Sequence, residues 1–457
     1  MFYGFRRPKQ SEKSIQTAFS EEGFSLRRVS LVFVVFVLLC TITYGSTSHP
    51  IVKGTFIQEW LTVHWTDEMW DSELEYLKEV GIEFLIVAPT GFGIGDGNLR
   101  TIYPSKKPNW TDYYPGVDLL GNTLRAAERH GMQVVIGLNM DDRWWQIGVK
   151  DPQWLEGQVE LGNQLAEEIY NLYYADYRDT ICGWYFVFEI DNLMVQQKNA
   201  VEVLAKAFNT HLDFLTELDP GLFFMWSPYM NSALATAESY GRFWTELFRE
   251  VRFREGDIFA PMDCVGGGGT TLENVARWFA EFRKAVDTKP GLLLYSNAEN
   301  FDHTDWTSAT VGRFISQLQL VDEYVDGFIN FAYPHYYSPN IIDHGFHKTY
   351  LTYVQTGEVE SQPPTPPRSI QAVEMPDGSV FLIWEGGEDD VGIAGYLVYR
   401  DGRFVGKTQT PRKNAEGYLN AFAEKNLREG RTYTYVLYAY DFAGNLSEPS
   451  EEFVFTR

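Results

Sequence analysis

Two glutamates of this chain, Glu189 and Glu299, stand where apolar runs give way to polar segments. Glu189 closes the run ICGWYFVFEI of residues 181–190, and Glu299 follows the run GLLLYS of residues 291–296. If both runs are strands of one α/β barrel, both carboxyl groups project into one pocket at its carboxyl end, where such folds carry their chemistry. Two convergent carboxyl groups are what cleavage of a glycosidic bond needs. For either glutamate alone, a structural ion pair or an exposed loop position is the alternative.

The rest of the sequence supplies the strands that such a barrel needs. From residue 54 onward, apolar strand-like runs alternate with helical patterns, which predicts repeated βα units and a parallel sheet. The eight predicted strands are residues 54–59, 82–88, 133–138, 183–188, 222–226, 258–261, 292–295 and 327–331. Eight units predict a TIM barrel, an α/β fold, over residues 50–356, with Glu189 and Glu299 at the ends of strands four and seven.

Local capping signals predict where three helices begin. Thr66 precedes a helical pattern, and Asp151 followed by Pro152 combines an acidic cap with a proline in the first turn. Thr270 and Glu273 have the spacing of a capping box, which predicts a helix start at Thr270.

Polar and aromatic residues at the other strand ends are candidates for the same pocket. The predicted substrate-binding residues are Glu59, Trp60, Asn139, Asp141, Trp144, Tyr229, Asp263, Asn297, Tyr333 and His335. Asp263 precedes the glycine run 265–269, which either lets a substrate approach the backbone or serves as a flexible connector. The run lacks the Lys-Ser/Thr ending of a phosphate loop, so no nucleotide is predicted to bind there. No cofactor is predicted for the protein.

Aromatic residues recur in or near the predicted loops at the carboxyl end of the barrel. They are Trp65, Trp110, Tyr113, Tyr114, Trp144, Trp145, Trp306, Tyr336 and Tyr337. The apolar faces of sugar rings pack on aromatic rings, so we expect several of these residues to contact a glycan and the others to pack the loops.

Charge and ligand spacing argue against other classes of function. The 457-residue chain has 62 acidic and 38 basic residues, and its formal charge of −24 repels nucleic acid and anionic lipid surfaces. Asp302, His303 and Asp305 are close in sequence, as are Asp141 and Asp142, but neither spacing matches a recognised ligand set, so no metal is predicted. The cysteines, too few for a disulfide framework, are Cys40, Cys182 and Cys264.

Residues 1–49 are predicted to be a signal peptide or an N-terminal membrane anchor. The apolar stretch 31–42 follows two arginines and precedes small residues, as in an export signal. The stretch is shorter than the roughly 20 residues of a membrane span. An uncleaved membrane tether is the alternative if flanking residues extend the span. Either interpretation places the folded part outside the cell or on its surface.

A second domain is predicted after the proline-rich linker of residues 357–367. Residues 368–457 contain short alternating apolar runs between turn residues, which predicts a small all-β sandwich of the immunoglobulin-like type. Trp384, Tyr396 and the tyrosine-rich run 433–440 resemble a fibronectin type III domain. That resemblance implies a spacer or adhesion domain without chemistry of its own.

The segments GTFIQEW, GWYFVFEIDN, APMDCVGGGG and YSNAENFD resemble a bacterial barrel family, domain of unknown function 4434, and more distantly the clan A glycoside hydrolases. In that clan the acid/base ends strand four and the nucleophile ends strand seven, which implies these roles for Glu189 and Glu299. The chain departs from the clan pattern in two places. Phe188 stands where Asn usually precedes the acid/base, and the end of strand eight, residues 330–333, lacks the usual tryptophan.

The sequence therefore predicts a retaining glycoside hydrolase that acts on a polysaccharide or oligosaccharide outside the cell. The alternative is a surface protein that binds glycan in an inactive barrel, and a third interpretation is a metal-assisted hydrolase. The sugar, its linkage, the choice between internal and terminal cleavage and the oligomeric state stay open.

Overall fold

The computed structural model describes residues 49–457, except for residues 96, 414–416 and 425. Residues 50–457 form one compact unit. The predicted signal or anchor stretch, residues 31–42, lies outside the described residues, so it stays a prediction. In the part of the chain that is described, no helix combines the length and apolar character needed to cross a membrane.

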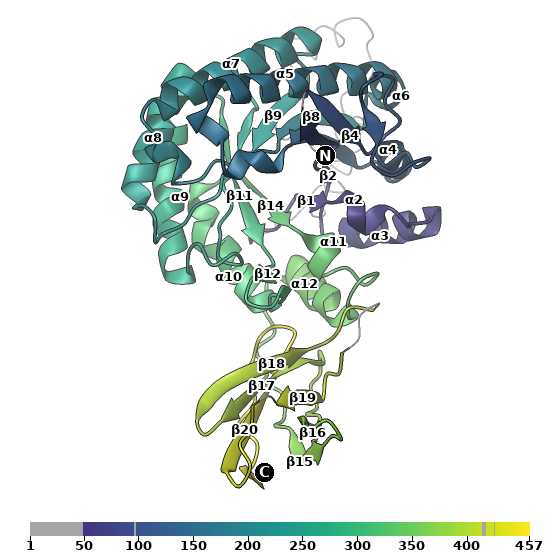
Figure 1. The fold of residues 1–457 in the computed structure, drawn as a ribbon, viewed down its shortest axis with the longest axis vertical. Coiled ribbons are helices and arrows are strands. Elements are labelled where there is room, and N and C mark those ends of the chain that lie inside the picture. The colour runs from purple at the N-terminus through teal and green to yellow at the C-terminus, as the bar shows by residue number, and fades with distance from the viewer. Residues whose placement is uncertain (1–48, 96, 414–416, 425) are drawn as a thin grey trace, which may run out of the picture. The chain divides into compact units, whose positions relative to one another are not determined.

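Eight parallel strands close into a barrel, which confirms all eight predicted strands and the TIM-barrel fold (Figure 1). In chain order they are β1 (Gly54–Ile57), β2 (Phe84–Val87), β6 (Gln133–Gly137), β8 (Ile181–Phe186), β9 (Phe223–Trp226), β10 (Ile258–Phe259), β11 (Leu293–Glu299) and β14 (Gly327–Phe331). Barrel strand four is thus β8 and strand seven is β11. The seventh strand is longer than predicted, because its last residue is Glu299 itself.

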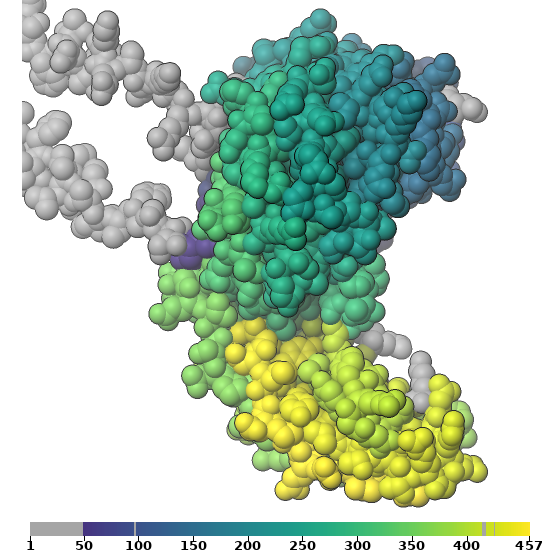
Figure 2. All heavy atoms as spheres, turned by 90° about the vertical axis from the view of Figure 1, so that its left-hand side faces the viewer, coloured from purple at the N-terminus to yellow at the C-terminus, as the bar shows by residue number. Residues whose placement is uncertain are grey.

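A helix follows each barrel strand and packs its apolar face on the sheet. The helices are α3 (Asp67–Glu79), α4 (Leu119–His130), α5 (Pro152–Ile169), α7 (Ala200–Leu218), α8 (Ala237–Glu250), α9 (Leu272–Val286), α10 (Val311–Val321) and α12 (His344–Thr356). Figure 2 faces the side that carries α8 and α9, and the barrel residues on this face are teal and green.

Two of the three predicted helix starts are confirmed. The Thr66 side chain accepts a hydrogen bond from the third residue of α3, and Asp151 caps α5 through two backbone N–H groups. The third prediction, a capping box at Thr270, is wrong. Helix α9 begins after Thr271, and the Thr270 hydroxyl instead donates to the carbonyl oxygen of Asp263 at 2.6 Å.

The loops that follow the barrel strands carry short elements of their own. After β2 and β6, the strands β3 (Gly91–Gly95), β4 (Asn98–Thr101), β5 (Thr111–Asp112) and β7 (Asn139–Met140) form a small sheet. The loops also contain α2 (Glu59–Thr62), the hairpin β12 (Phe301–Asp302) and β13 (Thr307–Ser308), α11 (Tyr333–Tyr336), and the 3-10 helices Asp142–Trp145, Gly148–Lys150 and Met194–Gln196. These elements lie at the end of the barrel where the predicted site residues gather.

Residues 368–457, here called the C-terminal module, form two antiparallel sheets around a core that includes Leu382, Trp384 and Tyr396. One sheet has β15 (Arg368–Glu374), β16 (Val380–Glu385) and β19 (Ala421–Glu424), and the other has β17 (Ile393–Arg400), β18 (Arg403–Gln409), β20 (Thr432–Asp441) and β21 (Phe453–Thr456). This arrangement confirms the β-sandwich, while its assignment as a fibronectin type III domain stays a prediction.

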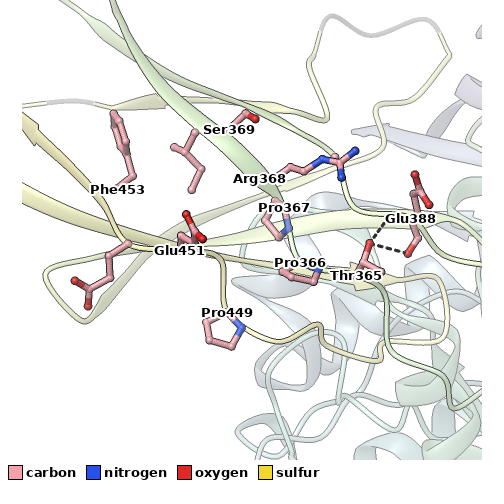
Figure 3. Close-up of a pocket in the computed structure, with 12 residues that line it drawn as sticks. Thr365, Pro366, Pro367, Arg368, Ser369, Glu388, Pro449, Glu451 and Phe453 are labelled. Carbon is pink, nitrogen blue, oxygen red and sulfur yellow. Dashed lines mark hydrogen bonds between the residues drawn. The ribbon is translucent and has the colours of Figure 1, made fainter.

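A hollow of about 580 Å³ lies beside the linker and β15 (Figure 3). Residues Pro366, Glu388 and Phe453 are among those that line it. It contains none of the predicted site residues, so the chemistry has to be sought in the barrel.

The C-terminal module makes direct contacts with the barrel helices. The backbone N–H groups of Val311 and Gly312, at the start of α10, donate to the carbonyl oxygens of Phe442 and Ala443 at 2.8 and 2.9 Å. The first N–H groups of a helix lack partners inside the helix, and here the module supplies them. The Phe442 ring packs edge-on against Phe346 of α12, with ring centres 4.8 Å apart. A domain that served only as a spacer would not need these contacts with the barrel.

We expect Phe442→Ala to lower the free energy of unfolding by about 3 kcal/mol, because it removes a buried aromatic ring from this contact. Urea denaturation followed by tryptophan fluorescence measures the change. Phe404→Ala is the matched control, since that ring is 55% exposed and its loss should change stability by less than about 0.5 kcal/mol. Equal effects of the two substitutions would contradict the prediction.

Candidate active site

The structure brings Glu189 and Glu299 to one site at the carboxyl end of the barrel. Glu299 ends β11, and two residues earlier the Asn297 amide donates to the hydroxyl of Ser227, beyond the end of β9, at 2.9 Å. Side chains alternate along a strand, so Glu299 points inward like Asn297. Burial raises the pKa of Tyr229, and the charges of both glutamates add to this effect. Burial and the charge of Asp263 raise the pKa of Glu299, with a further contribution from the charge of Glu189. The charge of Glu189 therefore reaches Glu299.

Glu299 is a buried carboxyl group, 4% exposed, that the backbone holds in place. The N–H of Gly267 donates to its Oε2 at 2.5 Å. Burial first, and the charge of Asp263 second, raise its pKa to about 8, while the Gly267 hydrogen bond and the charge of Arg313 act in the opposite direction. Glu299 therefore keeps its proton to a higher pH than an ordinary glutamate.

The glycine run predicted as a substrate approach or a connector packs directly against Glu299. A Cβ atom on Gly266 would lie 2.7 Å from the Glu299 Cβ and 2.6 Å from the Phe301 carbonyl oxygen. Gly268 has a positive φ of 74°, and a Cβ there would meet the His303 ring at 2.4 Å. Only glycines leave room for this loop between Glu299 and His303, so the run positions the carboxyl group.

Asp263, predicted to bind substrate, supports the backbone of β11. Its carboxylate accepts hydrogen bonds from Val265 N–H at 3.1 Å and from the Gln317 amide at 2.5 Å, and more weakly from Glu299 N–H at 3.4 Å. Burial raises its pKa to about 6. Helix α10 adds two donors to the Glu299 carbonyl oxygen, the Gln317 amide at 3.0 Å and the Arg313 guanidinium at 3.2 Å.

Glu189 lies just beyond β8 in a different environment. Burial, followed by the charge of Asp191, raises its pKa to about 7. The Trp144 indole donates to its backbone carbonyl oxygen at 2.7 Å, and the Trp144 side chain itself is fully buried. The preceding Phe188 packs on Trp144 and Trp154, with ring centres 5.1 and 6.1 Å away. Phe188 therefore belongs to the core between sheet and helices, which accounts for an apolar residue where the resemblance implies Asn.

Three further predicted residues gather beside barrel strands one and eight. Glu59 is 8% exposed, and burial raises its pKa. Trp60 is 48% exposed, and its ring meets the His335 ring edge-on at 5.0 Å. The buried His335 ring packs on Phe331, and its Nε2 has no hydrogen-bond partner among the described residues. This corner offers an exposed aromatic ring above a neutral histidine.

The remaining predicted residues have their polar atoms engaged within the protein. The Asn139 amide donates to both the carbonyl and the side-chain oxygen of Gln158, at 3.2 and 3.0 Å. The Asp141 carboxylate forms an ion pair with Arg143, and the Tyr333 hydroxyl bonds to Nδ1 of His347. None of these contacts involves Glu189 or Glu299.

Four residues that support Glu299 are not predicted from the sequence: Gly266, Gly267, Arg313 and Gln317. The sequence shows the glycines only as a run, and their contact with Glu299 requires the fold. Arg313 and Gln317 have the spacing of ordinary helix residues, one turn apart. Nothing local in the sequence marks them.

One solved structure that is similar to this chain is a "putative alpha-L-fucosidase" from Bacteroides thetaiotaomicron VPI-5482. It aligns with a TM-score of 0.53 and 24% sequence identity over 64% of this chain and 88% of that chain. The likeness shows the fold.

Sequence comparison finds curated relatives that match a small part of this chain, and a family that matches most of it. Chitinase Chi52 of Paenibacillus xylanexedens is 34% identical over 96 residues, 21% of this chain and 17% of the chitinase. Chitinase D of Niallia circulans is 40% identical over 74 residues, 16% of this chain and 12% of that protein. The chain thus spans a small fraction of these relatives' length. The family described as "Domain of unknown function (DUF4434)" matches residues 52–343, and the chain belongs to that family.

Proposed function

We propose that this protein is a retaining glycoside hydrolase that acts on a polysaccharide or oligosaccharide outside the cell. The observation that carries the proposal is the pair Glu189 and Glu299, two carboxyl groups with raised pKa values at the ends of barrel strands four and seven, where the charge of Glu189 reaches Glu299. Carboxyl groups with raised pKa values in one site are a signature of acid–base chemistry.

In the proposed reaction, Glu299 is the nucleophile and Glu189 the acid. A carboxylate oxygen of Glu299 forms a bond to the anomeric carbon while the bond from that carbon to the leaving oxygen breaks, and Glu189 gives its proton to the leaving oxygen. A water molecule then gives a proton to Glu189, and its oxygen displaces Glu299 from the anomeric carbon. The sugar leaves with its original configuration, and both carboxyl groups return to their starting states.

Glu189 and Glu299 both have raised pKa values, so the pair retains a proton to a higher pH than two ordinary glutamates would. The proposed chemistry requires this proton on Glu189 and a carboxylate on Glu299. Positive charge that develops on the anomeric carbon in the transition state favours the carboxylate on Glu299. Gly267 N–H and Arg313 act in the same direction, whereas no described residue donates a hydrogen bond to the Glu189 carboxyl group. The pair with one proton is the working form.

We expect Glu299→Gln to reduce the release of reducing ends from a cleaved glycan by about 1,000-fold or more, because glutamine cannot form the glycosyl ester. A polysaccharide panel identifies the substrate, and a matching 2-fluoro glycoside followed by peptide mass spectrometry should label Glu299. Glu202→Gln, at an exposed position on α7, is the control and should retain activity. Full activity of Glu299→Gln would overturn the proposal, and glycan binding without any reducing ends would support the binding-protein alternative.

A second prediction needs no substrate. Because burial raises the pKa of Glu299 from its ordinary 4.5 to about 8, the folded state binds more protons than the unfolded state between these values, and its stability falls as the pH rises through them. Glu299→Gln keeps a neutral group and should be more stable than the wild type at pH 9 by at least about 1.4 kcal/mol, the value of one pKa unit. Denaturation curves at pH 5 and pH 9 measure this difference. A stability gap that does not grow with pH would contradict the raised pKa.

A third prediction tests the glycine run as the support of the nucleophile. Gly266→Ala places a methyl group 2.7 Å from the Glu299 Cβ, so the carboxyl group has to move, and we expect kcat to fall by about 100-fold. Gly157→Ala is the matched control, because a Cβ at this position in α5 meets nothing within 4 Å. It should leave kcat unchanged. Circular dichroism spectra should show both variants folded, and wild-type kcat in Gly266→Ala would refute this role of the loop.

A further inference from the structure

The segment that follows β18 ties the C-terminal module to loops at the site end of the barrel. Gln409 accepts a hydrogen bond from Ser308 N–H at 3.0 Å and donates to the Ser308 carbonyl oxygen at 2.9 Å. Lys413 N–H donates to the carbonyl oxygen of Ile341 at 2.9 Å. Ser308 lies in the loop after barrel strand seven, and Ile341 lies in the loop after strand eight. The segment between Gln409 and Lys413 is therefore held next to the site.

Arg412 lies in this segment, and its guanidinium carbon is 5.3 Å from the centre of the Tyr336 ring. A cation over an aromatic face is attracted to it, so the contact fixes the side chain. The charge of Arg412 also reaches His335, where it adds to the effect of burial and lowers the pKa to about 3. Arg412 thus acts on two residues of α11, one of which was predicted to bind substrate.

Tyr336 begins an aromatic stack that ends at the surface. Its ring stacks on Phe301 at 5.4 Å, and Phe301 stacks on Trp306 at 5.5 Å. Trp306 is 63% exposed, so this end of the stack is open to solvent. The stack lies close to the proposed nucleophile, because the Arg313 guanidinium donates to the carbonyl oxygens of both Glu299 and Phe301, at 3.2 and 2.6 Å. Phe301 and Tyr336 are buried, so the exposed Trp306 ring is the part of the stack on which a sugar ring can pack.

Among the described residues Arg412 has no ion-pair partner, in contrast to the nearby Lys407. Lys407 forms ion pairs with Asp302 and Asp305 at 3.0 and 3.2 Å. No carboxylate of the described residues lies within ion-pair distance of Arg412, although the whole chain carries a formal charge of −24. A guanidinium group offers five N–H donors in a planar fork that fits the two oxygens of a carboxylate or sulfate.

We propose that the C-terminal module completes the substrate site and that Arg412 binds an anionic group of the glycan, a carboxylate or a sulfate ester, while another sugar of the same glycan packs on the exposed ring of Trp306. The inference rests on the proposed function, since it names the class of substrate for the same site. It gives the module a role in substrate recognition, which a spacer or adhesion domain does not have.

Binding to the full chain with Glu299→Gln tests the inference without interference from cleavage. The probes are an array of oligosaccharides that contain uronic acids or sulfate esters, each with its carboxyl-reduced or desulfated neutral counterpart. Adding Arg412→Gln should weaken binding of the acidic member of a pair by about tenfold or more and that of the neutral member by less than about twofold. Adding Lys413→Gln is the matched control, because it removes the same charge from an exposed position in the same segment. It should change neither affinity.

The outcomes separate this inference from the proposed function. Preference for uronic acids over sulfate esters, or the reverse, identifies the anion. If no acidic glycan binds better than its neutral counterpart, or if Arg412→Gln weakens both members of a pair equally, the inference is overturned, even where the wild type cleaves a neutral glycan. If binding depends on Arg412 but the wild type releases no reducing ends from the same acidic glycan, the inference stands and the hydrolase proposal fails.

Discussion

Closure of the barrel is the constraint on which the site depends. Strands β1 and β14 pair in parallel, with Gly54 opposite Ile329 and Thr55 opposite Asn330, and this pairing joins the first strand to the last. All eight strands then point their carboxyl ends to one side. Glu189 and Glu299 share neither a helix nor a hairpin. They belong to one site only because the sheet curves into a closed barrel, so that the ends of β8 and β11 face the same interior.

Burial raises the pKa values of the two carboxyl groups and also lowers the stability of the protein when they are ionised. A buried carboxylate that lacks hydrogen bonds is expensive, so the structure surrounds Glu299 with donors and a nearby cation. Gly267 N–H bonds to the side chain, and Arg313 and Gln317 bond to the backbone. Gly266 makes the approach of the loop sterically feasible. Stability and reactivity therefore oppose each other at Glu299, as is common at active sites.

The barrel could be predicted from sequence because strands that are buried on both faces appear as continuous apolar runs, and all eight runs are strands. The position of Glu299 followed from the same signal. The start of α9 could not be predicted, because Thr270 has the local pattern of a cap while its hydroxyl makes a tertiary hydrogen bond to Asp263. Arg313 and Gln317 could not be identified for a similar reason: their roles depend on which strand lies beneath α10.

Helix α10 connects the C-terminal module to the proposed nucleophile. Its N-cap residue, Thr310, makes no side-chain cap, and the first free N–H groups of the helix donate to carbonyl oxygens of the module. Arg313, in the first turn, and Gln317, one turn later, hold the Glu299 carbonyl oxygen. An α-helix of three turns is a stiff element, so a displacement of its first turn would move both donors. The module is thus linked to the site twice, by α10 beneath Glu299 and by Arg412 beside Tyr336, and a domain joined to the barrel only through its linker would provide neither link.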